Sequence, residues 1–66
     1  MTVTVNGEER PVRDGITLEE LLEEIALSSA RVAVERNGTI VPRARFSEVT
    51  LQEGDRLEVV HFVGGG

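Results

Sequence analysis

Residues 17–26 read Thr-Leu-Glu-Glu-Leu-Leu-Glu-Glu-Ile-Ala, and this stretch decides the fold. Its apolar residues recur at intervals of three and four, which is the spacing of one face of an α-helix, and its glutamates occupy the remaining face. Thr17 stands three residues before Glu20, the spacing of a capping box at a helix start. We therefore predict one amphipathic helix that begins at Thr17 and ends near Ser28 and Ser29. Its apolar face must be buried against another element.

A β-hairpin is predicted before this helix. Residues 2–5 read Thr-Val-Thr-Val, which has the two-residue period of a half-buried strand. Asn6 and Gly7 follow, and because both tolerate positive φ, this pair favours a tight hairpin turn. Residues 8–13 are expected to return as a second strand. Pro11 cannot donate a ladder hydrogen bond, so this second strand should lie at a sheet edge.

Further strands are predicted after the helix. Val32 and Val34 alternate with more polar neighbours, and an Asn-Gly pair at 37–38 repeats the hairpin signal. Pro42 should stop the strand that follows that turn. The predicted elements are a strand over residues 31–35, a short strand over 40–41, a loop or single helical turn over 43–50, a turn over 53–55, and a last strand over 56–62.

The predicted order is strand, strand, helix, strand, short strand, strand. The helix can bury its apolar face only on one face of the sheet. This arrangement is the β-grasp, or ubiquitin-like, fold of the α+β class, with a mixed sheet of four to five strands and one main helix. We expect residues 1–63 to form this domain and residues 64–66 to form a flexible glycine tail. The predicted core consists of Val3, Val5, Leu18, Leu21, Leu22, Ile25, Val32, Val34, Ile40, Leu51, Leu57 and Val59.

Composition argues against several classes of function. The chain has 66 residues, a net charge of -5, no Cys, one His and no Lys. Without Cys there is neither a thiol nucleophile nor a Cys-based zinc site, and we expect no metal site. The acidic charge repels phosphate backbones, which argues against nucleic-acid binding. No apolar run could cross a membrane and the start is not a signal peptide, so we expect a cytoplasmic protein. We also expect the chain to be monomeric when free. Without Lys, the chain cannot form lysine-linked chains of itself.

The last three residues are Gly64, Gly65 and Gly66, directly after an apolar strand. Chain ends are often disordered, so glycines alone are weak support for a function. A segment without Cβ atoms can, however, pass through a narrow channel and bring the carboxylate of Gly66 to a partner's active site. That carboxylate is ionised at neutral pH and must be activated, most simply as a mixed anhydride with AMP. The sequence has no Walker-type loop and no nucleophile–base pair, so we expect no catalytic residue and no bound cofactor here.

Residues 37–43 read Asn-Gly-Thr-Ile-Val-Pro-Arg, and residues 60–66 read Val-His-Phe-Val-Gly-Gly-Gly. Together with residues 3–7, 17–22 and 54–55, these segments resemble the ThiS family of sulfur carriers in thiamine thiazole biosynthesis. The resemblance covers essentially the whole chain. One departure is that the family more often ends in two glycines, whereas this sequence has three. The reactive group remains the carboxylate of whichever residue comes last.

The resemblance implies a mechanism and a set of partners. An E1-like adenylyltransferase of the ThiF type would use ATP to adenylate the carboxylate of Gly66. Sulfur from a cysteine desulfurase or an equivalent donor would displace AMP and leave a thiocarboxylate. A thiazole synthase of the ThiG type would then take the sulfur into the thiazole ring. Gly66 would be the modified residue and Gly64 and Gly65 the access segment, so the chain would be a protein co-substrate and not an enzyme.

Three apolar residues beside the tail are predicted to dock partners: Val60, Phe62 and Val63. Val60 and Phe62 should point away from the helix, on the open face of the sheet, where apolar side chains favour a docking patch. An exposed apolar pair is also compatible with ordinary surface. His61 is expected to be a partly exposed strand-end residue and Arg43 an exposed loop residue, and no chemical role is assigned to either.

Other functions remain open at this level. Within the carrier class, the alternatives are the small subunit of molybdopterin synthase and a carrier for tRNA thiolation or protein conjugation. The molybdopterin family often has prolines before its tail, where this chain has residues 61–63, His-Phe-Val, and this difference favours the thiamine branch. An alternative from another class is a TGS-type β-grasp binding module. Such modules share the Asn-Gly hairpin and the helix but normally sit inside larger proteins and do not end in bare glycines.

Overall fold

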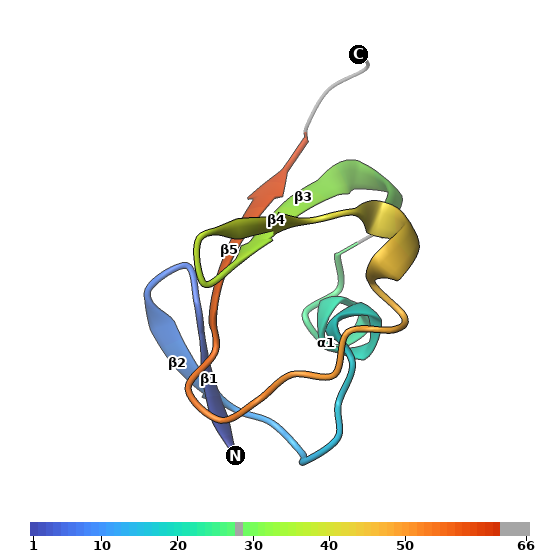
Figure 1. The fold of residues 1–66 in the computed structure, drawn as a ribbon. Helices are drawn as coiled ribbons and strands as arrows, with labels where there is room; N and C mark the ends of the chain where they lie inside the picture. Colours follow the sequence, from blue (N-terminus) through green and yellow to red (C-terminus); the bar gives the residue numbers. More distant parts are fainter. Residues whose placement is uncertain (28, 63–66) are drawn as a thin grey trace.

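The computed structural model describes residues 1–27 and 29–62. One mixed sheet of five strands, in the order β2-β1-β5-β3-β4, carries helix α1 on one face (Figure 1). The predicted β-grasp fold is therefore confirmed. In chain order the elements are β1 (Thr2–Val5), β2 (Glu8–Pro11), α1 (Leu18–Glu24), the 3₁₀ turn η1 (Ser29–Arg31), β3 (Val32–Arg36), β4 (Thr39–Val41), the 3₁₀ turn η2 (Arg43–Arg45) and β5 (Arg56–His61).

The first and last strands lie side by side in the middle of the sheet. β1 and β5 pair in parallel, whereas the other strand pairs are antiparallel. Each hairpin turns on an Asn-Gly pair with positive φ at both residues, 50° and 85° at Asn6 and Gly7, and 52° and 86° at Asn37 and Gly38. These are the conformations that a two-residue turn requires and that Asn and Gly tolerate best. β2 lies at a sheet edge, as Pro11 predicted.

The start of α1 has every backbone N–H of its first turn satisfied. Thr17 and Glu20 form the predicted capping box: the Glu20 N–H donates to Thr17 Oγ1 at 3.1 Å and the Thr17 N–H donates to Glu20 Oε1 at 3.0 Å. This backbone bond lowers the pKa of Glu20, with a further contribution from Arg13, 2.7 Å away. The N–H groups of Leu18 and Glu19 donate to backbone carbonyls of the segment that leads to β5. The helix start is thereby tied to that segment.

The helix is shorter than the sequence predicted. It ends at Glu24, with Ile25 as its C-cap and Ala26 in the left-handed region at φ 61°. The N–H of Ala26 donates to the Glu23 carbonyl and that of Leu27 to the Leu22 carbonyl, which is the hydrogen-bond pattern of a Schellman motif. The predicted end near Ser28 and Ser29 is wrong: Ser29 begins η1, and residue 28 lies outside the described residues.

The buried core lies between α1 and the sheet. Two of the predicted core residues, Ile25 and Ile40, are not fully buried. Ile25 is only partly buried because the helix ends there, and Ile40 is 71% exposed. The prediction for Ile40 was wrong because β4 pairs Ile40 with Glu35, a residue of the open face. The buried apolar residues are Val3, Val5, Val12, Ile16, Leu18, Leu21, Leu22, Val32, Val34, Phe46, Leu51, Leu57 and Val59.

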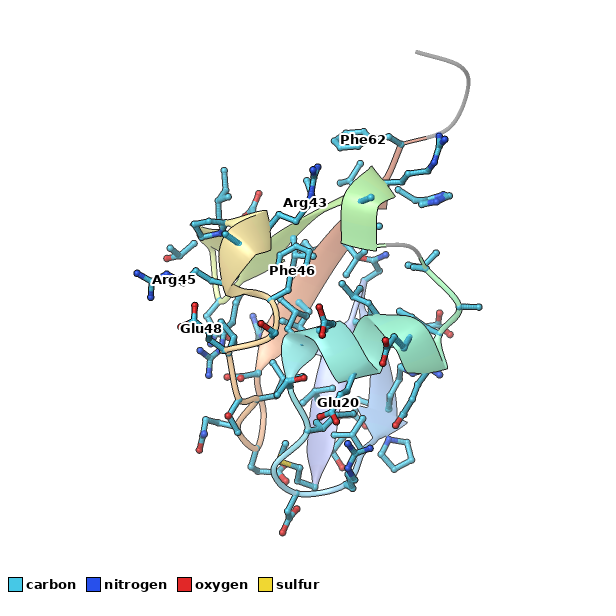
Figure 2. The ribbon with its side chains drawn as sticks, turned by 90° about the vertical axis from the view of Figure 1, so that its right-hand side faces the viewer. Glu20, Arg43, Arg45, Phe46, Glu48 and Phe62 are labelled. Atoms are coloured by element: carbon cyan, nitrogen blue, oxygen red, sulfur yellow. The ribbon has the colours of Figure 1, made fainter. Side chains whose placement is uncertain are left out.

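Three of these core residues were missed by the sequence prediction, namely Val12, Ile16 and Phe46. All three lie between regular elements, where no periodicity marks a buried position. Phe46 directly follows η2 and extends toward α1 (Figure 2), and its side chain is only 1% exposed. Among the described residues, no helix is long and apolar enough to cross a membrane.

Candidate carrier terminus and docking face

Strand β5 leads to the glycines, and two asparagine side chains fix its backbone. The amide of Asn6 accepts from the Val59 N–H at 2.7 Å and donates to the Val59 carbonyl at 3.0 Å. Asn37 Oδ1 accepts from the Arg56 N–H at 2.9 Å. Asn6 and Asn37, which form the two hairpin turns, are therefore also hydrogen-bonded to the backbone of the central strand β5. The asparagines of the two Asn-Gly turns thus also fix the strand that precedes the glycines.

The turn before β5 is fixed by a buried carboxylate, Asp55, which is 6% exposed. Its Oδ2 accepts from the Gln52 N–H at 2.8 Å and from Arg36 Nε at 2.9 Å, and its Oδ1 accepts from Asn37 Nδ2 at 3.0 Å. Burial alone would raise the pKa of Asp55, but these three donors outweigh burial and hold the pKa below its ordinary value. Asp55 is therefore a charged structural residue that joins the β3–β4 turn to the start of β5.

The far end of β5 lies at the opposite end of the molecule from Met1 (Figure 1). The ladder with β3 reaches His61, which pairs with Val32, and the Phe62 N–H donates to the Arg31 carbonyl at 2.7 Å. His61 is the last residue of β5 and is exposed, as the sequence predicted. The backbone is thus hydrogen-bonded up to Phe62, the last of the described residues.

Several predicted site residues lie outside the described residues. These are the docking residue Val63, the access glycines Gly64 and Gly65, and the modified residue Gly66. The predicted boundary between the domain and its tail falls in the same segment. The roles of these docking, access and modified residues stay predictions.

The open face of the sheet carries the other predicted docking residues. Val60 pairs with Ala33 on this face and is 57% exposed, and Phe62 is 53% exposed. Ile40 adds a third exposed apolar side chain, which the sequence prediction assigned to the core. A two-residue turn at 37–38 fixes the register of the β3–β4 hairpin, so the exposure of Ile40 follows from its pairing with Glu35. The predicted exposure of Val60 and Phe62 is confirmed, and their docking role stays a prediction.

The predicted loop residue Arg43 is exposed and lies in η2. Figure 2 shows it in the part of the molecule where Phe62 also lies. Within residues 1–27 and 29–62, no carboxylate forms an ion pair with Arg43, whereas its neighbour Arg45 lies 3.9 Å from Glu48. No role for Arg43 therefore follows from the ion pairs of the described residues.

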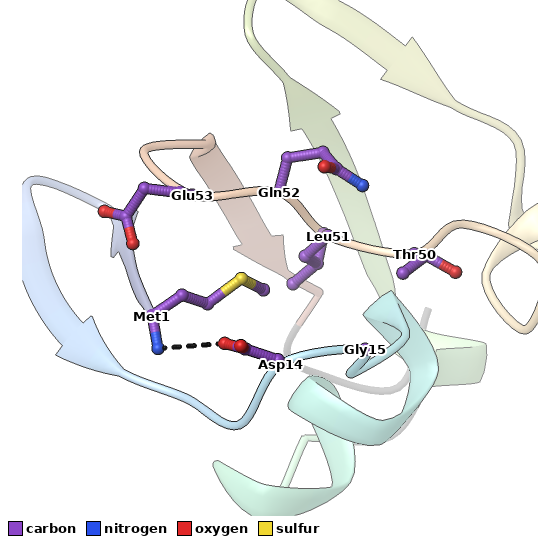
Figure 3. Close-up of a pocket in the computed structure, with 7 residues that line it drawn as sticks. All are labelled: Met1, Asp14, Gly15, Thr50, Leu51, Gln52 and Glu53. Carbon is purple, nitrogen blue, oxygen red and sulfur yellow. Dashed lines mark hydrogen bonds and ion pairs between the residues drawn. The ribbon is translucent and has the colours of Figure 1, made fainter.

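An open depression lies at the other end of the molecule, beside Met1 (Figure 3). The amino group of Met1 donates to the Val12 carbonyl at 2.9 Å and pairs with Asp14 at 3.3 Å, and Glu53 Oε1 accepts from the Thr2 N–H at 3.0 Å. These polar groups are engaged within the fold. The depression is also remote from the end of β5, so it takes no part in the candidate site.

A β-grasp domain whose central strand leads into a glycine run, with apolar side chains exposed beside it, defines the class of ubiquitin-like carriers and modifiers. Residues 3–66 match the model of the ThiS family. The sulfur carrier protein ThiS of Bacillus subtilis is 44% identical over 54 residues, which are 82% of each chain. The crystal structure of the thiamine biosynthesis protein ThiS from Geobacter metallireducens is 35% identical, covers 100% of both chains and superimposes with a TM-score of 0.83. The chain belongs to the ThiS family.

A longer relative contains a segment that is similar to this chain. The thiazole synthase of Paramagnetospirillum magneticum is 47% identical over 66 residues, which are 100% of this chain and 20% of that protein. The chain therefore spans about a fifth of the length of this relative. The family match favours the thiamine branch over the molybdopterin and TGS alternatives.

Proposed function

We propose that this chain is a sulfur carrier for thiamine thiazole biosynthesis. Membership of the ThiS family carries this proposal. The fold supports it, because β5, the strand that precedes the three glycines in the sequence, is paired on both sides in the centre of the sheet. Gly66 is the proposed modified residue, with Gly64 and Gly65 as the access segment.

The proposed chemistry takes place at the carboxylate of Gly66. A carboxylate oxygen attacks the α-phosphorus of ATP, a P–O bond forms, and pyrophosphate leaves. A sulfur nucleophile at the oxidation level of sulfide then attacks the acyl carbon, and AMP leaves with the bonding electron pair. The product is a thiocarboxylate, in which one carboxylate oxygen has been replaced by sulfur. The sequence has no Cys and no Lys, so this chain offers no thiol or side-chain amine that would capture the activated acyl group.

Catalysis would then be carried out by partner enzymes, and this chain would be a co-substrate without enzymatic activity. A ThiF-type adenylyltransferase would bind ATP and activate Gly66, and a cysteine desulfurase or an equivalent donor would supply sulfur. Where the donor is a persulfide, a thiol reductant would supply the two electrons that bring its sulfur to the level of sulfide. A ThiG-type thiazole synthase would receive the sulfur, and the relatives named thiazole synthase support this last partner. Because activation consumes ATP, we propose a cytoplasmic location.

A growth experiment tests the proposal. A bacterial strain that lacks its own thiamine sulfur carrier is supplied with this chain, ending at Gly66, and is grown without thiamine. We expect growth with the full chain and none after deletion of Gly65 and Gly66. An Asp14→Asn variant, altered at the opposite end of the domain, should grow like the wild type and serves as the control. Growth of the deletion variant at the wild-type rate would overturn the proposal.

A further inference from the structure

Two glutamates face each other on the open face of the sheet. Glu35 of β3 and Glu58 of β5 are directly paired in the strand register, and both are exposed. Like charges in directly opposed positions destabilise a sheet. Among residues 1–27 and 29–62, no cation lies within 4.0 Å of either carboxylate. Arg56 lines a depression together with both glutamates, but it forms no ion pair with them within that distance. Glu35 and Glu58 are thus directly opposed, with no salt bridge to a cation of the described residues.

The acidic pair borders an apolar groove. The groove has a volume of about 80 Å³ and is lined by Ala33, Val34, Glu35, Ile40, Glu58 and Val60. Ile40 and Val60 are 71% and 57% exposed, so the groove offers apolar surface with two negative charges at its side. A second depression, on the side of Asn37 and Arg56, is also lined by both glutamates. A partner side chain thus has access to the carboxylates from either side.

This groove lies within reach of the proposed reactive group. Val60 precedes Gly66 by six residues, which span at most about 20 Å when fully extended. An enzyme that acts on the carboxylate of Gly66 therefore has surface close to the groove. The tail itself has no side chains from residue 64 onward, so it offers little for recognition. The enzyme that activates the carrier must select it by the surface of the folded domain.

We propose that the acidic groove, defined by Ala33, Glu35, Ile40, Glu58 and Val60, binds the adenylating enzyme. The occupant is a protein surface that inserts an aliphatic side chain between Ile40 and Val60 and places an arginine or lysine between the two carboxylates. Charge-assisted hydrogen bonds to that cation convert the repulsion between Glu35 and Glu58 into attraction on binding. This inference rests on the proposed function and deepens it, because it specifies how the activating partner recognises the domain.

The test uses the full chain and its ThiF-type adenylyltransferase in an ATP–pyrophosphate exchange assay. For the double variant Glu35→Gln/Glu58→Gln we expect KM for the carrier to rise about tenfold, the loss of about one charge-assisted bond, with kcat unchanged. The midpoint of thermal unfolding of the free variant should rise by a few degrees, because the repulsion is gone. The wild-type KM should also rise with ionic strength more steeply than that of the variant.

The matched control is Glu9→Gln, which removes an exposed carboxylate at the far edge of the same sheet. Its KM should equal that of the wild type. A double variant with a wild-type KM would overturn the docking inference and leave the carrier function intact. A defect confined to the thiazole synthase step would also overturn the assignment to the adenylating enzyme. If the wild-type chain supports no exchange at all, the proposed function fails and the docking inference fails with it.

Discussion

Replacing Asp55 by Asn is the most informative perturbation of the fold, because it keeps the shape of the side chain and removes its charge. The carboxylate accepts three hydrogen bonds, from Gln52, Asn37 and Arg36. An asparagine has only one acceptor oxygen, so its NH₂ group must face at least one of these donors. A buried donor that loses its partner costs about 1–3 kcal/mol, and a bond to a charged group contributes about 1.5–3 kcal/mol.

We therefore expect Asp55→Asn to lower the free energy of unfolding by about 2–4 kcal/mol at neutral pH. A domain of this size has a total stability of roughly 3–10 kcal/mol, so the loss is a large fraction of it. The midpoint of thermal unfolding should fall by about 8–30 °C, at about 4–8 °C per kcal/mol. Because the chain has no Trp or Tyr, urea and thermal unfolding are best followed by far-ultraviolet circular dichroism.

The pH dependence provides a second signature. The pKa of Asp55 is lowered in the folded state, so its contribution to stability is present above its unfolded value near 3.8 and is lost as the pH falls through the folded value. The difference between wild type and Asp55→Asn should be constant near neutral pH and shrink in acid. Asp14→Asn is the control, because Asp14 is 89% exposed and should change stability by less than about 0.5 kcal/mol. A loss of that small size for Asp55→Asn would refute the reasoning.

Three further substitutions test the packing and the helix ends by the same unfolding measurements. Ala26→Gly should raise the free energy of unfolding by about 0.5–1 kcal/mol, because Ala26 has positive φ and glycine adopts that conformation without a Cβ penalty; a loss of stability would contradict the Schellman geometry. Thr17→Ala should cost about 0.5–2 kcal/mol through loss of the N-cap bond, and no change would show that the cap is dispensable. Phe46→Ala should cost about 3–5 kcal/mol, because the side chain is fully enclosed; a cost below about 1 kcal/mol would place Phe46 outside the core.

The predictable parts of this fold are those that short-range chemistry specifies. The Asn-Gly pairs at 6–7 and 37–38 define two hairpins, and Thr17 with Glu20 defines the helix start. The spacing of apolar residues in 18–22 identifies the buried face of α1. These signals are sufficient for the order of elements, and the order is sufficient for the β-grasp topology.

The unpredicted parts depend on contacts between distant segments. Phe46 and Ile16 are buried because irregular segments fold over the core, and no periodic pattern marks them. The helix ends early because Ala26 adopts a left-handed conformation that alanine intrinsically disfavours. The acidic groove was also missed, because Glu35 and Glu58 become neighbours only through the register of β3 and β5. Ile40 is the exception, since the two-residue turn before it already determines its face.

The most direct test of the carrier function is the intact mass of the protein after reaction. The chain ending at Gly66 is incubated with a ThiF-type adenylyltransferase, ATP and inorganic sulfide, and the product is measured by mass spectrometry with fragmentation. We predict a mass increase equal to the exchange of one oxygen for one sulfur, located on Gly66 and dependent on ATP. An unchanged mass, or a sulfur located at any other residue, would contradict the central claim.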